Sequence, residues 1–309
     1  MNSSSHGFNM STGLRSRDSY STAVAKNVIV LTLGLIINYI NGALIHTIRK
    51  HQIFYMKPHY VLFIHLVVND MIQLATTISL FVSTYIFYKI NVSLCCLIIT
   101  VVVFTTLNTP LNLAVMAAEC YIAVCLPLQH AKLCTIKRTH ILIGLIWAVS
   151  ALSALPDVFI TLATEPVQFF YSTIFCEKDN LFQHPLHSKK RNVCYIIYLV
   201  AVWLTLFYSY FKIFLAAKKA KAVKSGNGDT KKARNTILLH GFQLMLSMLT
   251  YVAHFFIKAL VYFFPTHYLQ IVFVCYILIQ IFPRFVSPIV YGLRDKTLRQ
   301  YLKKHLLCQ

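Results

Sequence analysis

Seven long apolar segments limit the possible folds of this chain more than any other feature of its sequence. A helix that crosses a membrane needs about 20 mostly apolar residues. Lipid offers no hydrogen-bond partners, so the backbone of each segment must bond internally as a helix. Strands of a membrane barrel would be shorter and would alternate in polarity. The expected helices are residues 27–48, 59–88, 95–118, 139–160, 192–211, 235–262 and 268–292.

The composition agrees with a membrane protein. Hydrophobic residues make up 57% of the chain and charged residues only 12%, whereas soluble domains carry roughly 25% charge. The net charge of +20 raises the question of a nucleic-acid partner. The basic residues are not gathered on a soluble domain, so we expect no nucleic-acid binding. No internal repeat stands out, which weakens a transporter interpretation. The predicted fold class is an all-α membrane protein, a bundle of seven transmembrane helices.

The charges of the loops predict the orientation of the bundle. Segments 49–58, 122–138, 212–234 and 293–309 carry 19 Lys and Arg residues, against 8 in segments 1–26, 89–94, 161–191 and 263–267. Basic loops stay in the cytoplasm. We therefore expect an extracellular tail over 1–26, the bundle over 27–292, and an amphipathic helix with a cytoplasmic tail over 293–309. Asn2 and Asn9 begin glycosylation sequons in the expected outer tail.

Several cysteines lie near the expected outer face. Cys95 and Cys96 begin the third segment, Cys176 lies in the long outer loop, and Cys194 opens the fifth segment. That side of a plasma membrane is oxidising, so a disulfide is expected there. Spacing alone does not choose which of these cysteines pair.

Four stretches, in the right order and on the right side, carry a resemblance to a known family. They are "HLVVNDMIQ" (His65–Gln73), "MAAECYIAVCLPLQH" (Met116–His130), "KARNTILLHG" (Lys232–Gly241) and "SPIVYGLRDKTLR" (Ser287–Arg299). With seven helices and an outer N-terminus, the chain resembles the rhodopsin-like G-protein-coupled receptors over nearly its whole length, and within them the fish odorant receptors. The resemblance implies a plasma-membrane receptor that binds a small odorant and activates a heterotrimeric G protein of the stimulatory class, with no cofactor.

The family's coupling residues are carried over with one departure. Glu119 stands where the family has the acid of its Asp-Arg-Tyr triplet, Cys120 stands where it has Arg, and Tyr121 completes the triplet. The family's ion pair cannot form, so we expect Glu119 to face the basic second loop (Lys132, Lys137, Arg138) or to be protonated. Cys120 is either a tolerated variant or a cause of weak coupling. Tyr210 and Tyr291 resemble two family tyrosines that meet in the active state. The alternative is that they are ordinary core aromatics.

Two charged residues lie at membrane depth, where an ionisable side chain is costly and is a candidate for function. Asp70 lies in the second segment and Arg284 in the seventh. In the family, the matching positions surround a small cation site. A guanidinium can replace that cation and bind a carboxylate with two hydrogen bonds. We predict a buried Asp70–Arg284 pair and no regulation by sodium at this site. The alternative is that Arg284 extends toward cytoplasmic water.

The family's spacing favours Cys95 over Cys96 as the partner of Cys176, and its pocket implies a ligand site between the outer halves of helices three, five, six and seven. The candidate ligand-binding residues are Val102, Thr105, Thr106, Tyr251, His254, Phe255, Lys258, Ile277 and Gln280. They form a mostly apolar set with a few polar groups, as is typical of small-molecule sites. Val102 replaces the Asp of amine receptors, which argues against a biogenic amine. Lys258 would attract an acidic odorant or extend to the surface.

The C-terminal segment and the third inner loop contribute to the inner face. Leu298, Tyr301, Leu302 and Leu306 recur at helical spacing after the seventh segment, which predicts an amphipathic helix on the membrane surface. Cys308 just beyond is either palmitoylated or free. The loop over 218–234 carries seven Lys or Arg residues, which suit a G-protein surface and also bind acidic lipid.

Other classes of protein have less support. The chain has no HExxH, GxSxG, P-loop or Gly-rich nucleotide motif, so we expect neither an enzyme nor a metal site. An odorant-gated ion channel of the insect type has the opposite orientation. A rhodopsin-like receptor for a non-odorant small molecule remains an alternative, as does a receptor that couples weakly because of Cys120.

Overall fold

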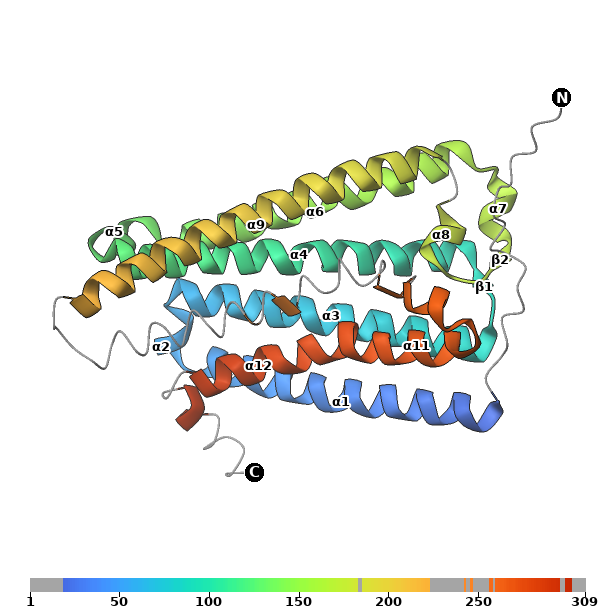
Figure 1. Ribbon diagram of the computed structural model, residues 1–309, viewed down its shortest axis with the longest axis horizontal. Coiled ribbons are helices and arrows are strands. Elements are labelled where there is room, and N and C mark those ends of the chain that lie inside the picture. The colour runs from blue at the N-terminus through green and yellow to red at the C-terminus, as the bar shows by residue number, and fades with distance from the viewer. Residues whose placement is uncertain are drawn as a thin grey trace.

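The protein forms a bundle of long helices (Figure 1). The computed structural model describes residues 19–182, 185–222, 242, 245–246, 256–257, 259–294 and 298–301. The long helices are α1 (Tyr20–Lys50), α3 (Pro58–Phe87), α4 (Val92–Cys125), α6 (Ile136–Thr164) and α9 (Pro185–Ala222). The last membrane segment is composite: η1 (Pro265–His267), α11 (Tyr268–Tyr276), η2 (Ile277–Ile281) and α12 (Phe282–Arg294). Most of the sixth expected segment, 235–262, lies outside the described residues.

Within the described part of the chain, five helices are long and apolar enough to cross a membrane. They are α1, α3, α4 up to Ala123, α6, and the composite segment from Pro265 to Ile289. α9 contains a shorter apolar stretch over Ile196–Lys212. The expected segments are therefore confirmed as helices wherever they are described, although most extend several residues further at each end.

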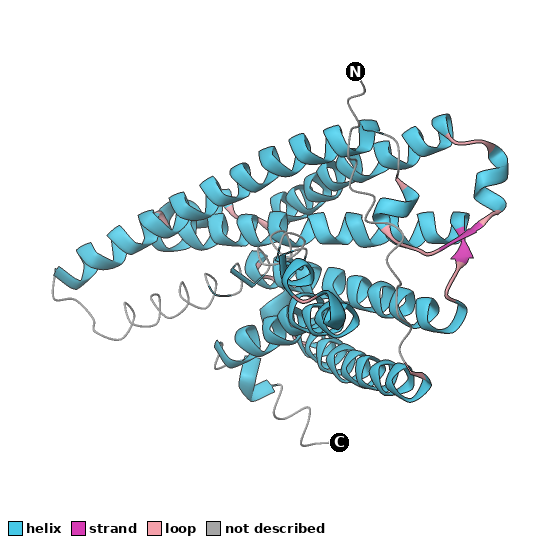
Figure 2. Ribbon diagram, turned by 45° about the vertical axis from the view of Figure 1, so that its right-hand side comes forward, coloured by secondary structure: helices cyan, strands magenta, loops and turns pink. Residues whose placement is uncertain are grey.

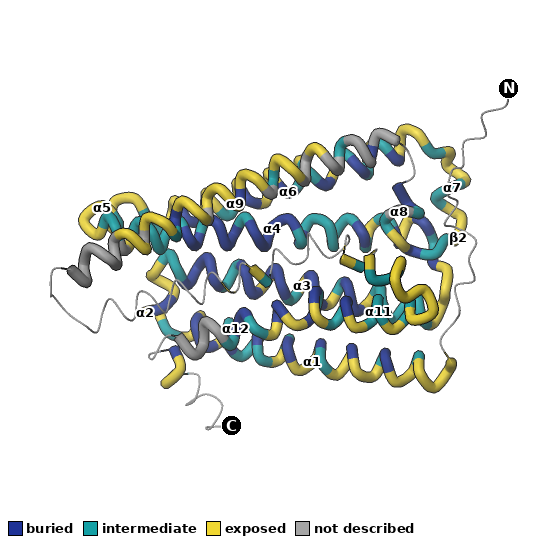
Figure 3. The backbone as a smooth tube through the Cα atoms, in the orientation of Figure 1, coloured by how far each residue is buried: buried dark blue, intermediate teal, exposed yellow. Residues whose placement is uncertain are grey.

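Helix α4 lies at the centre of the bundle. It packs against α3, α6 and α9, while α1 packs on the other side of α3. The main core cluster includes Phe63 and Leu66 from α3 and Leu113 and Met116 from α4, all fully buried. Buried residues run along α3 and α4, whereas the outward sides of α1, α6 and α9 are exposed (Figure 3). Those exposed sides are rich in large apolar residues, as expected of helices that face lipid.

A chain of buried amides and hydroxyls joins three of these helices. The Asn69 amide of α3 donates to the Thr109 hydroxyl at 3.0 Å and to the Thr105 carbonyl at 2.9 Å. Asn108 of α4 donates to the Asn69 carbonyl oxygen at 3.3 Å, and Ser150 of α6 donates to the Asn108 carbonyl oxygen at 2.6 Å. Buried polar groups that are bonded in this way specify one helix register, because a slip would leave them unsatisfied.

One end of the bundle, called the sheet end, carries a two-stranded antiparallel sheet (Figure 2). Strands β1 (Ile90–Asn91) and β2 (Thr173–Ile174) pair antiparallel, with Ile90 opposite Ile174. Short helices α7 (Val167–Tyr171) and α8 (Lys178–Leu181) flank β2. The Asn91 side chain caps α4 by accepting a bond from the Ser93 amide at 2.9 Å, a common way to begin a helix.

The opposite end carries α2 (Gln52–Tyr55) and α5 (Pro127–Leu133). Residues 298–301 are helical, and they belong to the predicted amphipathic segment. Leu298 is buried in the main core cluster. The Tyr301 ring lies 4.3 Å from the His51 ring and 5.6 Å from the Phe54 ring. The described part of the segment therefore packs its apolar side onto α2.

Candidate functional site

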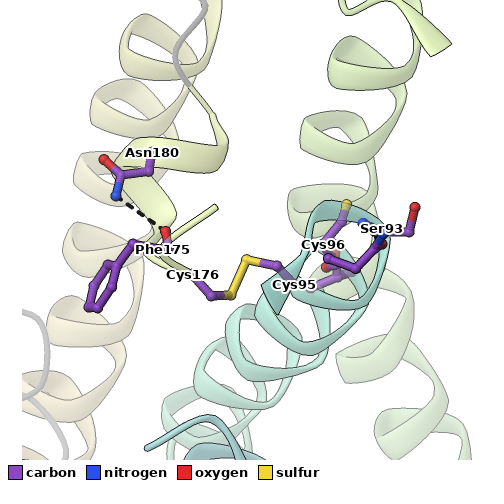
Figure 4. The surroundings of a disulfide bond; sticks show 8 residues. Ser93, Cys95, Cys96, Phe175, Cys176 and Asn180 are labelled. Carbon is purple, nitrogen blue, oxygen red and sulfur yellow. Dashed lines mark hydrogen bonds between the residues drawn. A yellow bond between two sulfur atoms is a disulfide. The ribbon is translucent and has the colours of Figure 1, made fainter. Parts of the chain in front are cut away.

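The disulfide at the sheet end of the bundle joins Cys95 to Cys176, as the family spacing implied (Figure 4). It ties the first turn of α4 to the segment that follows β2. The Asn180 amide fixes that segment further by donating to the Phe175 carbonyl at 3.2 Å. Cys96 is a free thiol, and its sulfur points away from Cys176 (Figure 4). The outer loop is therefore held over this end of the bundle.

The predicted ligand-binding residues on α4 are also used in contacts between helices. Thr105 is buried, and its backbone carbonyl accepts the Asn69 amide. The Thr106 hydroxyl accepts a bond from the Gln73 amide of α3 at 2.7 Å. Val102, one turn further out, is half-buried. Thr105 and Thr106 therefore take part in the packing of α4 on α3, and contact with a ligand stays a prediction for all three.

The predicted residues of the last segment lie in η2, a short π-helix. Ile277 packs against the cluster formed by α1 and α3, and the Gln280 side-chain oxygen is buried without a hydrogen-bond partner among the described residues. π-helical turns occur often at functional sites, because the wider turn frees backbone groups. The four candidates from the sixth segment lie outside the described residues: Tyr251, His254, Phe255 and Lys258.

Asp70 and Arg284 are both deeply buried, with 3% and 4% of their surface exposed. The Thr109 hydroxyl donates to the Asp70 carboxylate at 3.4 Å. The Arg284 guanidinium donates to the Ile279 carbonyl of η2 at 2.9 Å, and its charge attracts that of Asp70. Arg284 thus bonds backbone of the π-helical turn. A direct Asp70–Arg284 ion pair stays a prediction.

Glu119 has two histidine partners, which differ from the basic residues expected for it. The His59 ring, at the start of α3, lies 3.3 Å from Glu119 Oε2, and the His130 ring of α5 lies 3.0 Å from Oε1. Arg138 instead donates to the Lys132 carbonyl at 2.9 Å. The physical reason is that the Arg138 guanidinium is already bonded to the end of α5. The His59 and His130 rings instead contact the two carboxylate oxygens of Glu119.

The other predicted coupling residues are Cys120, Tyr121, Tyr210 and Tyr291. Cys120 is a half-buried thiol. The Tyr121 ring lies 6.0 Å from the Tyr208 ring of α9. The Tyr210 hydroxyl is buried with no hydrogen-bond partner in the described part of the chain. Tyr291 belongs to α12, but its side chain lies outside the described residues, so a Tyr210–Tyr291 contact stays a prediction.

The inner loop beside Glu119 carries another free thiol, Cys134, at the end of α5. Partial burial raises the pKa of the Cys134 thiol, and the negative charge of Glu119 raises it further. The thiolate is the reactive form of cysteine. The nearby positive charge of Arg138 offsets part of this increase in the pKa of Cys134, and the net effect favours the thiol over the thiolate.

A polar cluster near the sheet end of the bundle was not predicted from the sequence. The Lys190 ammonium of α9 lies 2.8 Å from Asp157 Oδ1 of α6, and the His187 ring lies 3.1 Å from the same oxygen. Lys190 also donates to the Ser153 carbonyl at 2.8 Å. A signal for this cluster was available, since Asp157 is the one acid within the fourth apolar segment.

Comparisons with known proteins agree with this architecture. Residues 20–291 match the family described as 7 transmembrane receptor (rhodopsin family). The chain is similar to "Odorant receptor 131-2" of Danio rerio, with 30% identity over 93% of this chain and 87% of that protein. It is also similar to "Olfactory receptor 1078" of Rattus norvegicus, with 26% identity over 63% of this chain and 57% of that protein. With its membrane-length helices around a central α4 and its tethered outer loop, the chain belongs to the rhodopsin family of seven-transmembrane receptors.

Proposed function

We propose that this chain is an odorant receptor, which binds a small odorant and activates a heterotrimeric G protein of the stimulatory class. The observation that carries the proposal is the similarity to the zebrafish odorant receptor, which extends over 93% of this chain. The family consists of signalling receptors rather than enzymes. The G-protein class rests on resemblance alone.

The orientation of the chain follows from charge and redox chemistry. The basic loops favour a cytoplasmic location for the end with α2 and α5. The Cys95–Cys176 disulfide belongs in an oxidising compartment, and it lies at the end of the bundle where α1 begins. Both arguments support an extracellular tail over 1–26 with glycans on Asn2 and Asn9, a bundle over 27–292, and a cytoplasmic segment over 293–309.

Signalling follows from a shift between two arrangements of the bundle. A ligand shifts such an equilibrium only by binding one arrangement more tightly than the other. The described members of the proposed ligand site are Val102, Thr105 and Thr106 of α4 and Ile277 and Gln280 of η2. At the cytoplasmic end, the inner parts of helices five and six move outward in the active arrangement and admit the G protein, by likeness to the family. Glu119, Cys120, Tyr121, Tyr210 and Tyr291 are the proposed coupling residues.

Cys120 supports a second candidate, a receptor that couples weakly. Its thiol carries no positive charge, so Glu119 bonds with His59 and His130 where the family has an arginine. The G protein would then lack the arginine contact on which family members rely. A receptor for a non-odorant small molecule shares the same fold and differs only in its ligand.

Cyclic-AMP output separates these candidates. Cells would express the natural chain or Cys120→Arg, each with an N-terminal epitope that is stained without permeabilisation to measure both surface level and orientation. They would be challenged with mixtures of amino acids, bile acids and small organic odorants. We expect a response from the natural chain. A response from Cys120→Arg alone, at equal surface level, would establish weak coupling instead. Surface staining that requires permeabilisation would refute the orientation.

A further inference from the structure

A cavity of about 790 Å³ lies between the outer parts of α1, α3 and α11. Its described lining has fourteen residues, and seven of them carry aromatic rings. None of the five predicted ligand-binding residues that the structure describes (Val102, Thr105, Thr106, Ile277 and Gln280) belongs to that described lining. The volume falls within the range of roughly 300–1,000 Å³ that small-molecule sites occupy. The cavity is therefore large enough for a ligand, at a place separate from the predicted site.

The walls of this cavity are built from fixed aromatic contacts. Phe81 of α3 stacks on Tyr276 of α11 with ring centroids 5.0 Å apart, and it also lies 4.9 Å from the Tyr85 ring. Beneath Phe81, the buried cluster that includes Val30 and Ile78 closes the cavity toward the bundle interior. Rings packed against one another keep their positions, so the cavity does not depend on a chance rotamer.

The outer loop covers part of the cavity. Phe175 belongs to the lining, and its ring lies 5.7 Å from the ring of Tyr88, another lining residue. Phe175 is held by its neighbour Cys176, through the disulfide, and by the hydrogen bond from Asn180 (Figure 4). A site whose walls are already in place binds its ligand with little ordering cost.

The polar groups of the lining indicate what kind of ligand fits. Hydroxyl groups come from four tyrosines and Thr84, and none of the fourteen residues is charged. The Asn27 amide donates to the Ala23 carbonyl at 3.0 Å, and the Asn27 oxygen accepts no bond within the described part of the chain. A small rotation of the Asn27 side chain would let this oxygen accept a hydrogen bond from a ligand hydroxyl.

A positive charge behind the wall excludes one class of ligand. The Lys26 ammonium lies 3.5 Å from the Leu269 carbonyl and 5.2 Å from the centre of the Phe273 ring, and both residues line the cavity. A ligand ammonium would find no carboxylate among the described lining residues to balance its charge. The ring faces and hydroxyls suit a flat, uncharged molecule.

We propose that this cavity is a second binding site, which takes an uncharged ring compound bearing a hydroxyl group. The ring body packs against Phe81 and Phe273, and the hydroxyl bonds with Asn27 or a lining tyrosine. The compound enters either from water, as a dissolved phenol, or from the bilayer, as a sterol. This proposal does not depend on odorant recognition or on G-protein coupling, because it concerns binding alone.

Binding of 2-naphthol to the full chain in phosphatidylcholine nanodiscs tests the proposal. The probe's own fluorescence is excited beyond the absorption of tryptophan. We expect saturable binding that weakens at least tenfold in Ala23→Trp, whose new ring fills the cavity. Val28→Trp is the matched control on the same helix, since Val28 is 56% exposed and does not line the cavity. It should bind like the natural chain.

A variant that does not fill the cavity guards against misfolding. Asn27→Leu keeps the volume of the side chain and removes its oxygen, so it should weaken 2-naphthol several-fold and leave naphthalene unchanged. If sterol in the nanodisc competes with 2-naphthol, the ligand comes from the membrane. If only dissolved phenols compete, the ligand comes from water. Either result supports the site. Binding that does not saturate, or that is equal in Ala23→Trp and Val28→Trp, would overturn the proposal.

Discussion

Glu119 sits at the inner end of α4 between two histidines from different parts of the chain. A carboxylate in this position would otherwise be poorly solvated, because only 12% of its side chain is exposed. The imidazoles of His59 and His130 supply the hydrogen bonds that water would supply elsewhere. Glu119, which has no arginine beside it, therefore ties α4 to the start of α3 through His59 and to α5 through His130.

Removing this carboxylate should destabilise the inner end. We expect Glu119→Ala to lower the free energy of unfolding by about 1–3 kcal/mol, because two half-buried imidazoles lose a charged acceptor. Glu119→Gln should cost less, since its amide still bonds with one ring. Thermal unfolding in nanodiscs measures both changes. Leu128→Ala, in the same loop with 96% of Leu128 exposed, is the control. Equal unfolding temperatures for Glu119→Ala and the control would contradict the prediction.

Asp70 and Arg284 present the same question deeper in the bundle. If they pair, then Asp70→Asn or Arg284→Gln alone should cost about 3–5 kcal/mol, because each leaves an uncompensated buried charge. Changing both to leucine should cost less than the sum of the single changes. The unfolding temperature should also be the same in sodium and choline chloride, since Arg284 supplies the cation. Additive single and double effects, or stabilisation by sodium, would show that no such pair forms.

At the scale of elements, the Asp157–His187–Lys190 cluster joins α6 to α9 near the sheet end of the bundle. Helices in lipid gain little from burying apolar surface, so polar contacts contribute more to their association. The disulfide fixes α4 to the outer loop at the same end. Outer contacts therefore hold α4, α6 and α9 in place. At the inner end, the bonds of Glu119 with His59 and His130 tie α4 to α3 and α5.

Breaking the cluster should loosen two helices and leave the rest unchanged. Lys190→Met removes bonds to Asp157 and Ser153, so we expect a loss of roughly 1.5–3 kcal/mol, as for hydrogen bonds to charged groups. Hydrogen–deuterium exchange should rise at the outer ends of α6 and α9. Lys132→Met removes an exposed lysine on the inner side and should change neither region. Uniform exchange across Lys190→Met would refute a local clamp.

At the scale of the whole molecule, the apolar segments predicted the membrane helices but not their ends. α4 continues past Ala118 to Cys125, because the histidines neutralise the cost of Glu119. α9 extends far beyond 192–211, because lysine and arginine favour helix and a helix outside lipid need not be apolar. Hydropathy reports burial in lipid, and it therefore says little about helix that projects into water.

The sites were predictable where a family motif or an apolar segment marked them. The Cys95–Cys176 bridge followed from family spacing, and the burial of Asp70 followed from its apolar surroundings. The partners of Glu119 did not, because His59 is sixty positions away in the sequence. The cavity near Asn27 was also missed, since its lining comes from α1, α3, α11 and the outer loop. Contacts between distant segments have no signature in a single sequence unless a family motif marks them.

The length of α9 has a mechanical consequence. Its 38 residues rise about 1.5 Å each, so the helix is roughly 57 Å long, almost twice the roughly 30 Å of the hydrocarbon layer. Lys190 holds it near one end. A stiff rod pivoting there is a lever about 48 Å long, and a tilt of about 5° would move its far tip by roughly 4 Å. A small rotation of α9 about its contact with α6 would therefore become a displacement of several ångströms at the opposite end of the helix.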